Sequence, residues 1–314
     1  MAEVVASTIP AFLLILLGGA LFHRQFLPAD TWAALQKLNY YLFLPAMFVA
    51  GLAGGNEFAA IPLFGLIVAV AFVLAAASAA VWLWYTRDAQ AAELGPQLLE
   101  AAVRANVPYG MAISLAVGGT AGLQTFLIAA ATYLPTVVVA GGVFNQLIGR
   151  RDSDAEADQE QAIATAFRLL ARNPIAAGIV LGAALNVLGI PLATGLNELV
   201  RAAGFAAIPI GLLATGAALS VAAAQNTLDA ARRTVVAVVT LKLILLPAVA
   251  GLAALVFGFS GVAATALVVI AALPGVVPRF TVVGEAAQSL LPGITTIATA
   301  LSVLTVPVAL WVFS

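Results

Sequence analysis

An arginine, an asparagine and a proline lie close together in the otherwise apolar stretch "VRANVPYGMAI", residues 103–113. Arg104 can bind a carboxylate through two parallel hydrogen bonds. Asn106 can donate from its amide nitrogen and accept at its oxygen. Pro108 removes a backbone donor and clashes with the preceding helical turn. These residue types predict an interrupted helix that offers polar groups to an anion. The simpler alternative is a proline kink with an ordinary i,i+4 pair between Glu100 and Arg104.

A second interrupted stretch occurs near the other end of the chain, "ALPGVVPRFTVVGEA", residues 272–286. Backbone groups released by proline cannot face lipid, so they must face protein or a wet cavity. Charged side chains inside apolar segments are costly and point to function by default. The predicted binding set therefore comes from both stretches: Arg104, Asn106, Pro108, Pro274, Pro278 and Arg279.

Further polar residues near these stretches are candidates for ion coupling. A proton could be carried by Glu100 or Glu285, since these are the acids that approach the apolar interior. A sodium ion could be held by backbone carbonyls together with the hydroxyls of Ser114, Thr136 and Thr281. Apart from such a coupling ion, we expect no metal and no cofactor. Lys242, in "TLKLILLP", is expected to snorkel to an interface or to form a structural pair.

The composition places the chain in a membrane. Of 314 residues, 63% are hydrophobic and 9% are charged, against about 25% charged in soluble domains. The net charge of −1 gives no indication of nucleic-acid binding. The absence of cysteine and the single histidine leave no parts for thiol, H-E-x-x-H zinc or triad chemistry. We therefore expect the protein not to be an enzyme.

Ten apolar segments are long enough to span a bilayer, which requires about 20 residues. A polar linker, residues 149–164, separates the two groups of five, which occupy residues 1–148 and 165–314. The expected all-α spans are residues 4–22, 32–53, 58–85, 96–118, 122–148, 165–188, 195–220, 231–257, 261–283 and 292–313.

Basic residues concentrate in the odd-numbered connections between these spans, whereas the even-numbered connections are nearly free of them. By the positive-inside rule, the odd connections and the linker are cytoplasmic and both termini face outward. Alanine is abundant and eleven arginines stand against two lysines, a bias that suggests a bacterial protein and hence the inner membrane.

The two halves share proline positions. Pro10 and Pro174 are separated by 164 residues, and so are Pro45 and Pro209. Five spans per half make the second half enter the membrane in the opposite sense. Such inverted repeats are typical of secondary transporters, which bind substrate near the midplane between interrupted helices. The fourth and ninth spans hold the two interrupted stretches and are expected to cross there.

The order of the motifs resembles the auxin efflux carrier family, in its bacterial branch, within the bile acid/auxin-type transporter superfamily. "LNYYLFLPAMFVAGLA" is similar to the second helix of that family, "RANVPYGMAISLAVGG" to the fourth and "ALPGVVPRFTVVGEA" to the ninth. The resemblance implies a scaffold of helices one, two, six and seven and a mobile transport domain of helices three to five and eight to ten. It also implies a homodimer, and organic anions such as auxin, malate or malonate as substrates. Ala112 departs from the pattern, since many members have a proline there.

The expected function is therefore secondary active transport of small organic anions by alternating access, with an elevator-type motion. The alternative is an uncoupled channel or facilitator for the same anions. For the homodimer, we expect Gly18 and Gly19 to allow close packing between subunits.

Overall fold

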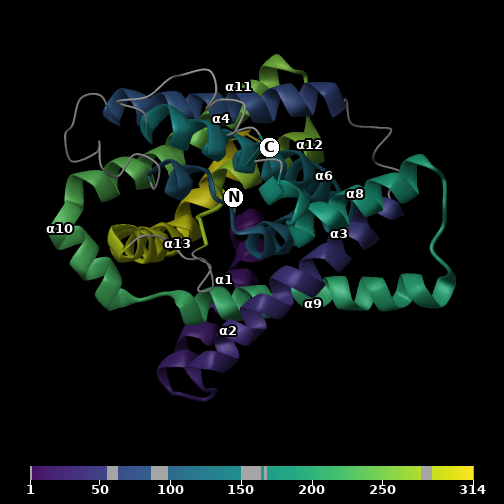
Figure 1. Ribbon diagram of the computed structural model, residues 1–314, viewed down its shortest axis with the longest axis horizontal. Helices are drawn as coiled ribbons and strands as arrows, with labels where there is room; N and C mark the ends of the chain where they lie inside the picture. Colours follow the sequence, from purple (N-terminus) through teal and green to yellow (C-terminus); the bar gives the residue numbers. More distant parts are fainter. Residues whose placement is uncertain are drawn as a thin grey trace.

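A computed structural model describes residues 2–54, 63–85, 98–149, 164–165, 168–276 and 285–313. These residues are helical with short connections and include no strand (Figure 1). The helices of the first half are α1 (Ala2–His23), α2 (Ala29–Leu38), the π-helical turn η1 (Asn39–Phe43), α3 (Leu44–Ala53), α4 (Leu63–Tyr85) and α6 (Val107–Gly149). Those of the second half are α8 (Pro174–Val187), α9 (Thr194–Ala218), α10 (Val221–Thr240), the π-helical turn η3 (Leu241–Leu245), α11 (Leu246–Val256), α12 (Gly261–Ala272) and α13 (Glu285–Phe313).

Several of these helices have the length and composition of membrane spans. Within the described residues, five helical stretches are long and apolar enough to cross a bilayer: residues 6–23, 98–139, 194–218, 221–256 and 290–313. Three shorter apolar helices cover residues 65–81, 174–187 and 261–272. The chain is therefore an all-α membrane protein, as its composition predicts.

The long helix α6 is two helices that fold back on each other at Gly119. Gly119 has φ 59° and ψ −149°, a conformation in which glycine is favoured. Three contacts join residues on the two sides of this turn: Ser114 with Gly122, Gly110 with Phe126 and Val103 with Tyr133. In each pair, one residue precedes position 118 by as many residues as the other follows it. Such a pattern is that of an antiparallel helical hairpin. Its turn agrees with the expected boundary between the spans at residues 96–118 and 122–148.

The helix α10 is bent as well. Ala231 interrupts α10 with φ −146° and ψ 43°, at the residue where the eighth span was expected to begin. The segment before the bend carries polar residues such as Gln225 and Asp229, and after Arg232, Arg233 and Thr234 the segment becomes apolar. Figure 1 shows α10 curving around the edge of the molecule at this bend. The helix therefore joins a surface segment to the expected span.

Two helix pairs pack through glycines at equivalent positions. A Cβ atom at Gly18 of α1 would collide with the backbone of Leu213 in α9. A Cβ atom at Gly182 of α8 would lie 3.0 Å from the Cα atom of Val49 in α3. Gly18 and Gly182 are 164 residues apart, and so are Val49 and Leu213. The α1–α9 and α3–α8 contacts therefore join residues that share the 164-residue offset of the proline pairs.

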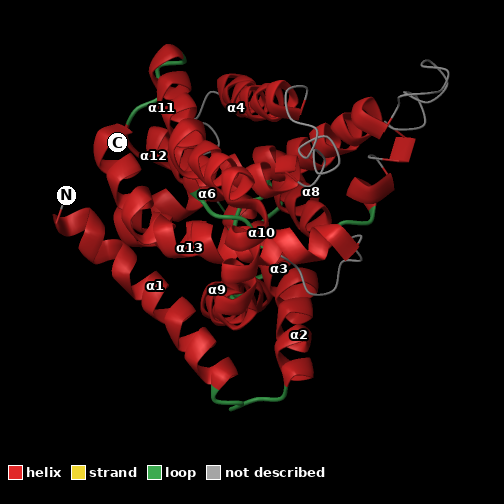
Figure 2. Cartoon of the chain, turned by 90° about the vertical axis from the view of Figure 1, so that its left-hand side faces the viewer, coloured by secondary structure: helices red, strands yellow, loops and turns green. Residues whose placement is uncertain are grey.

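The same packing corrects the expected role of the glycines in α1. Gly19 lies against Gly216 of α9, where an added Cβ would be 3.3 Å from the Gly216 carbonyl oxygen. Because both Gly18 and Gly19 face α9 inside the chain, they are not available for close packing between subunits. The helix α9 also contacts α2 and lies between α1 and α2 in Figure 2.

Candidate functional site

Two non-helical segments meet inside the molecule. Residues 104–106 separate the helical turn at residues 98–103 from α6, and residues 273–276 follow the end of α12. The backbone N–H of Asn106 donates to the carbonyl oxygen of Pro274 at 2.9 Å. A Cβ atom at Gly275 would lie 3.5 Å from the Cβ atom of Arg104. Thus the stretches quoted from the sequence lie against each other, backbone to backbone.

Asn106 begins the second half of its interrupted helix. Its side-chain oxygen accepts from the backbone N–H of Tyr109 at 3.2 Å, and its carbonyl accepts from the N–H of Gly110 at 3.0 Å. This is the geometry of an asparagine N-cap, with Pro108 in the first turn, where it breaks no helical hydrogen bond. The side-chain oxygen of Asn106 therefore satisfies a backbone N–H at the start of this helix.

The amide nitrogen of Asn106 has a partner that the sequence did not suggest. Asn106 is fully buried and donates to the hydroxyl of Thr215 in α9 at 3.0 Å. The Thr215 hydroxyl in turn donates to the carbonyl oxygen of Gly211 at 2.8 Å. In this conformation one of the two N–H groups of the amide is therefore engaged by Thr215.

Pro108 packs directly on α9 beside this hydrogen bond. A Cβ atom at Gly211 would collide with the Pro108 ring and would lie 2.7 Å from the amide nitrogen of Asn39. Asn39 is buried in the π-helical turn η1, and its side-chain oxygen has no hydrogen-bond partner among the described residues. Because Gly211 has no side chain, Pro108 of α6 and Asn39 of η1 can both lie close to α9.

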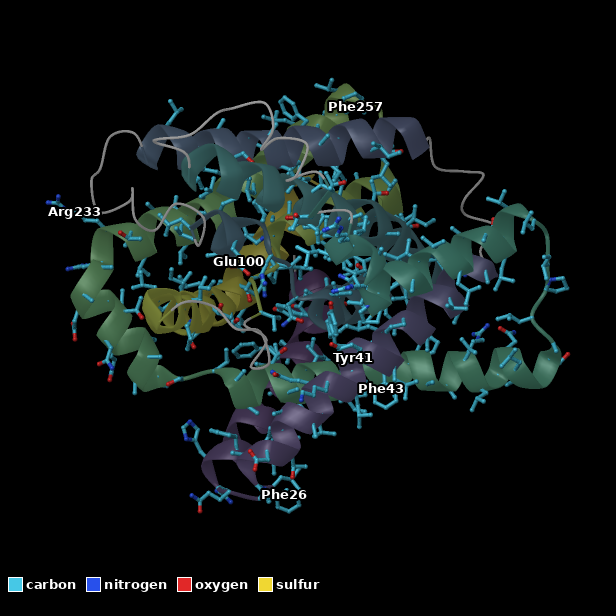
Figure 3. All side chains as sticks on the ribbon, in the orientation of Figure 1. Phe26, Tyr41, Phe43, Glu100, Arg233 and Phe257 are labelled. Carbon is cyan, nitrogen blue, oxygen red and sulfur yellow. The ribbon has the colours of Figure 1, made fainter. Side chains whose placement is uncertain are left out.

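Arg104 and Glu100 form an i,i+4 ion pair at the end of the first half-helix. Their side chains remain 33% and 28% exposed, so the pair is open to solvent. Arg104 also donates to the carbonyl oxygen of Val276 at 3.4 Å, across to the second break. Figure 3 shows Glu100 in the middle of the view, whereas Arg233 and Phe257 lie at its periphery. The ordinary pair foreseen as an alternative is present, and it sits at the junction.

Tyr133 stabilises the carbonyl end of the first half-helix. Its hydroxyl donates to the carbonyl oxygen of Val103 at 2.6 Å, and its side chain is 1% exposed. Val103 is the last helical residue before the break, so its carbonyl lacks a regular helical donor. Tyr133 comes from the second arm of the α6 hairpin, and its hydroxyl supplies the donor that the Val103 carbonyl would otherwise lack.

The other predicted residues are distributed differently. The hydroxyl of Ser114 is buried without a hydrogen-bond partner among the described residues, whereas Thr136 donates to Thr132 within its own helix at 2.7 Å. The predictions on Pro278, Arg279 and Thr281 lie outside the described residues, and so does the side chain of Glu285.

The expectation that Lys242 snorkels to an interface is wrong. Its side chain is 1% exposed, so it does not snorkel. Its ammonium nitrogen has no hydrogen-bond partner, and no ion pair of Lys242 is found in the described part of the chain. The sequence shows that Lys242 lies in an apolar segment, but it does not show whether the ammonium group has a partner.

Sequence reasoning also missed Thr215, Gly211 and Tyr133. Each lies on a helix far along the chain from the interrupted segment that it contacts. The only available signal was composition, since Gly211 and Thr215 are spaced one turn apart in "GLLAT". Such a pair marks a close helix contact but does not name the partner.

The fold and this junction define an all-α membrane protein with two interrupted segments in contact at its interior. A sequence model described as membrane transport protein matches residues 3–310. The chain therefore belongs to this family of membrane transporters, the auxin efflux carrier family. No curated protein matches the sequence.

Proposed function

We propose that this protein is a secondary transporter of small organic anions, mono- or dicarboxylates, and that it works by alternating access. The observation that carries the proposal is the Asn106–Pro274 hydrogen bond between the two breaks. It brings an N-capped half-helix, a proline-broken segment and the Arg104–Glu100 pair to one interior junction. Half-helix N-termini and broken backbones are what transporters use to hold anions and coupling ions.

The architecture in this proposal is ten spans in two inverted repeats. Counting the hairpin of α6 as two spans, and η1 and η3 as turns within single spans, gives five spans before the linker and five after it. The exchanged contacts Gly18–Leu213 and Gly182–Val49 support the repeat, because they share one residue offset. The fourth and ninth spans then cross at the junction, and both termini face the outside of the bacterial inner membrane.

The moving parts in this proposal are spans three to five and eight to ten, which slide as an elevator along spans one, two, six and seven. In support, the buried residues of α9 are mostly small, namely Gly204, Ala207, Gly211, Ala214, Thr215, Gly216 and Ala217, and the larger ones are Ile208 and Leu212. A face with few bulky side chains favours sliding. The scaffold is proposed to form a homodimer, as the family resemblance implies.

Uptake by purified protein in proteoliposomes tests the proposal. A panel of labelled carboxylates is offered with an inward sodium gradient or an inward proton gradient imposed in turn. Accumulation above the external concentration with one of the gradients is expected. Equilibration without accumulation, whatever the gradient, would instead indicate an uncoupled facilitator or channel.

A further inference from the structure

Lys242 is a buried lysine with no counter-charge among the residues that the structure describes. Of the charged side chains that the structure describes, Glu100, Arg104 and Lys242 are not exposed. Glu100 and Arg104 neutralise each other. The Lys242 ammonium is fully buried and has no hydrogen-bond partner among the described residues. An unpaired charge in this position is costly, since neither water nor an opposite charge compensates for lost hydration.

The helix geometry puts Lys242 at the depth of the second break. It precedes the turn at Phe257 by 15 residues, or about 22 Å of helix at 1.5 Å per residue. After this turn, α12 packs back against α11 and runs for 12 residues, or about 18 Å, before the break at Leu273 and Pro274. The π-helical turn η3, which contains Lys242, also packs against α12 and α13. Lys242 therefore lies at about the depth of the interrupted segment, on a turn that contacts α12 and α13.

The local backbone is irregular at this lysine. Lys242 occupies η3, a five-residue π-helical turn between α10 and α11. Single π-helical turns within α-helices occur frequently at functional sites, because they cost stability and release a carbonyl from the regular pattern. An irregular turn, a buried ammonium and a neighbouring break coincide in one place.

We infer that the Lys242 ammonium is the counter-charge of the bound anion, and that the site accepts one negative charge. The inference rests on the proposed function, since it names the charge of its substrate. Arg104 is already compensated by Glu100, so it orients the junction and adds no net charge. Arg279 and Glu285 have opposite formal charges, so together they do not change this balance. The substrate class is thus a monocarboxylate, or a dicarboxylate carrying a single charge.

Three molecules of nearly equal size test the charge. Malonate carries two negative charges near neutral pH, malonamate carries one and malonamide carries none. Binding of each to the full-length protein in lipid nanodiscs is measured by calorimetry. Wild-type protein is expected to prefer malonamate at least tenfold over both others. A preference for malonate, or equal binding of all three, would overturn the inference without requiring any variant to fold.

Variants at Lys242 identify the group that supplies the charge. Lys242→Met is expected to lower malonamate affinity by about 30-fold or more, because a desolvated charge pair is lost. The melting temperature of the unliganded protein should not fall, because the substitution removes an unpaired buried charge. Lys242→Arg should retain the preference for one charge. Lys37→Met, on the exposed side of α2, is the matched control and should bind as wild type does.

The opposite pattern indicates a structural lysine. In that case Lys242→Met keeps its malonamate affinity within twofold of wild type but has a lower melting temperature. The double variant Lys242→Met/Glu285→Gln then regains the wild-type melting temperature. This result would show that Lys242 pairs with Glu285 and that the inference is wrong. Wild-type protein that binds none of the three probes also contradicts the inference. If that protein in addition takes up no carboxylate of the panel, the proposed function fails with it; if uptake succeeds, the inference alone fails.

Discussion

The amide nitrogen of Asn106 lies 3.0 Å from the hydroxyl of Thr215 and donates to it. This hydrogen bond joins the break in the fourth expected span to α9, which belongs to the proposed scaffold. In an elevator motion the two residues have to separate. In the proposed mechanism the bond would therefore stabilise one position of the transport unit, and it occupies one of the two Asn106 N–H groups that an anion could use.

Thr215→Val should release the Asn106 amide without removing it. A neutral hydrogen bond contributes about 0.5–1.5 kcal/mol net, so carboxylate affinity should stay equal to wild type or rise by up to about tenfold. Calorimetry with malonate and malonamate measures this change. The matched control is Thr125→Val, since Thr125 is equally buried and bonds only to Ala121 in its own helix. A tenfold loss of affinity in Thr215→Val alone would show that the threonine itself binds the anion.

Asn106→Ala should weaken binding, in contrast to Thr215→Val. The substitution removes the N-cap of the second half-helix, which costs about 1 kcal/mol of stability, and it removes the amide donor. We expect folded, monodisperse protein with reduced carboxylate affinity, checked by size-exclusion chromatography and calorimetry on the same sample. Wild-type affinity in Asn106→Ala would exclude the amide from the site.

Tyr133→Phe tests how the first half-helix is held at the break. The variant keeps the ring but leaves the buried carbonyl of Val103 without its donor, at a cost of about 1–3 kcal/mol. Thermal unfolding in detergent should show a lower melting temperature than for wild type. Tyr109→Phe is the comparison, because the Tyr109 hydroxyl is 3.5 Å from Ser302 and makes a weaker interaction. Equal losses in both variants would contradict the assignment of the Val103 bond as the stronger one.

Gly211→Ala should obstruct the junction. Its methyl group would collide with Pro108 and press on Asn39, and such overpacking costs about 1–3 kcal/mol. Transport should fall more strongly than stability if Pro108 has to pass α9 during the cycle. Gly195→Ala is a control in the same helix, since nothing lies within 4 Å of its added Cβ. Initial uptake rates, normalised to folded protein, separate the two variants.

The proposed topology predicts which side of the membrane each connection faces. Because the native chain has no cysteine, single cysteines can be labelled without background. Ser153→Cys in the linker should react only from the cytoplasm, and Ser260→Cys, in the turn before α12, only from outside. Labelling of Ser153→Cys from the periplasm alone would reverse the orientation.

Local chemistry made part of this fold predictable. The turn at Gly119 and the bend at Ala231 lie where runs of apolar residues are interrupted, so span boundaries followed from composition. The interruption of the helix followed from the types of Asn106 and Pro108, whereas the capping role of Asn106 is seen only in the structure. The Pro45–Pro209 offset pointed to a repeat, which stays a proposal, and the contacts of Gly18 and Gly182 share the same offset.

Contacts between distant helices could not be predicted in this way. Thr215 is one of many small residues in α9, and only the three-dimensional arrangement places it opposite Asn106. Gly18 was assigned to a subunit interface, because a close-packing glycine does not reveal whether its partner is in the same chain. Lys242 was expected to find water or a partner, since burial of an unpaired charge has no sequence signature.

Protection of a single cysteine at the junction tests most directly whether the anion binds where the two breaks meet. Ala105 lies between Arg104 and Asn106 and is partly exposed, so Ala105→Cys should react with a small methanethiosulfonate reagent in reconstituted protein. Saturating malonamate, with malonate in a parallel series, should slow this reaction severalfold, while Ser260→Cys reacts at an unchanged rate. An Ala105→Cys rate that neither carboxylate changes, in protein that transports them, would place the site elsewhere and contradict the account.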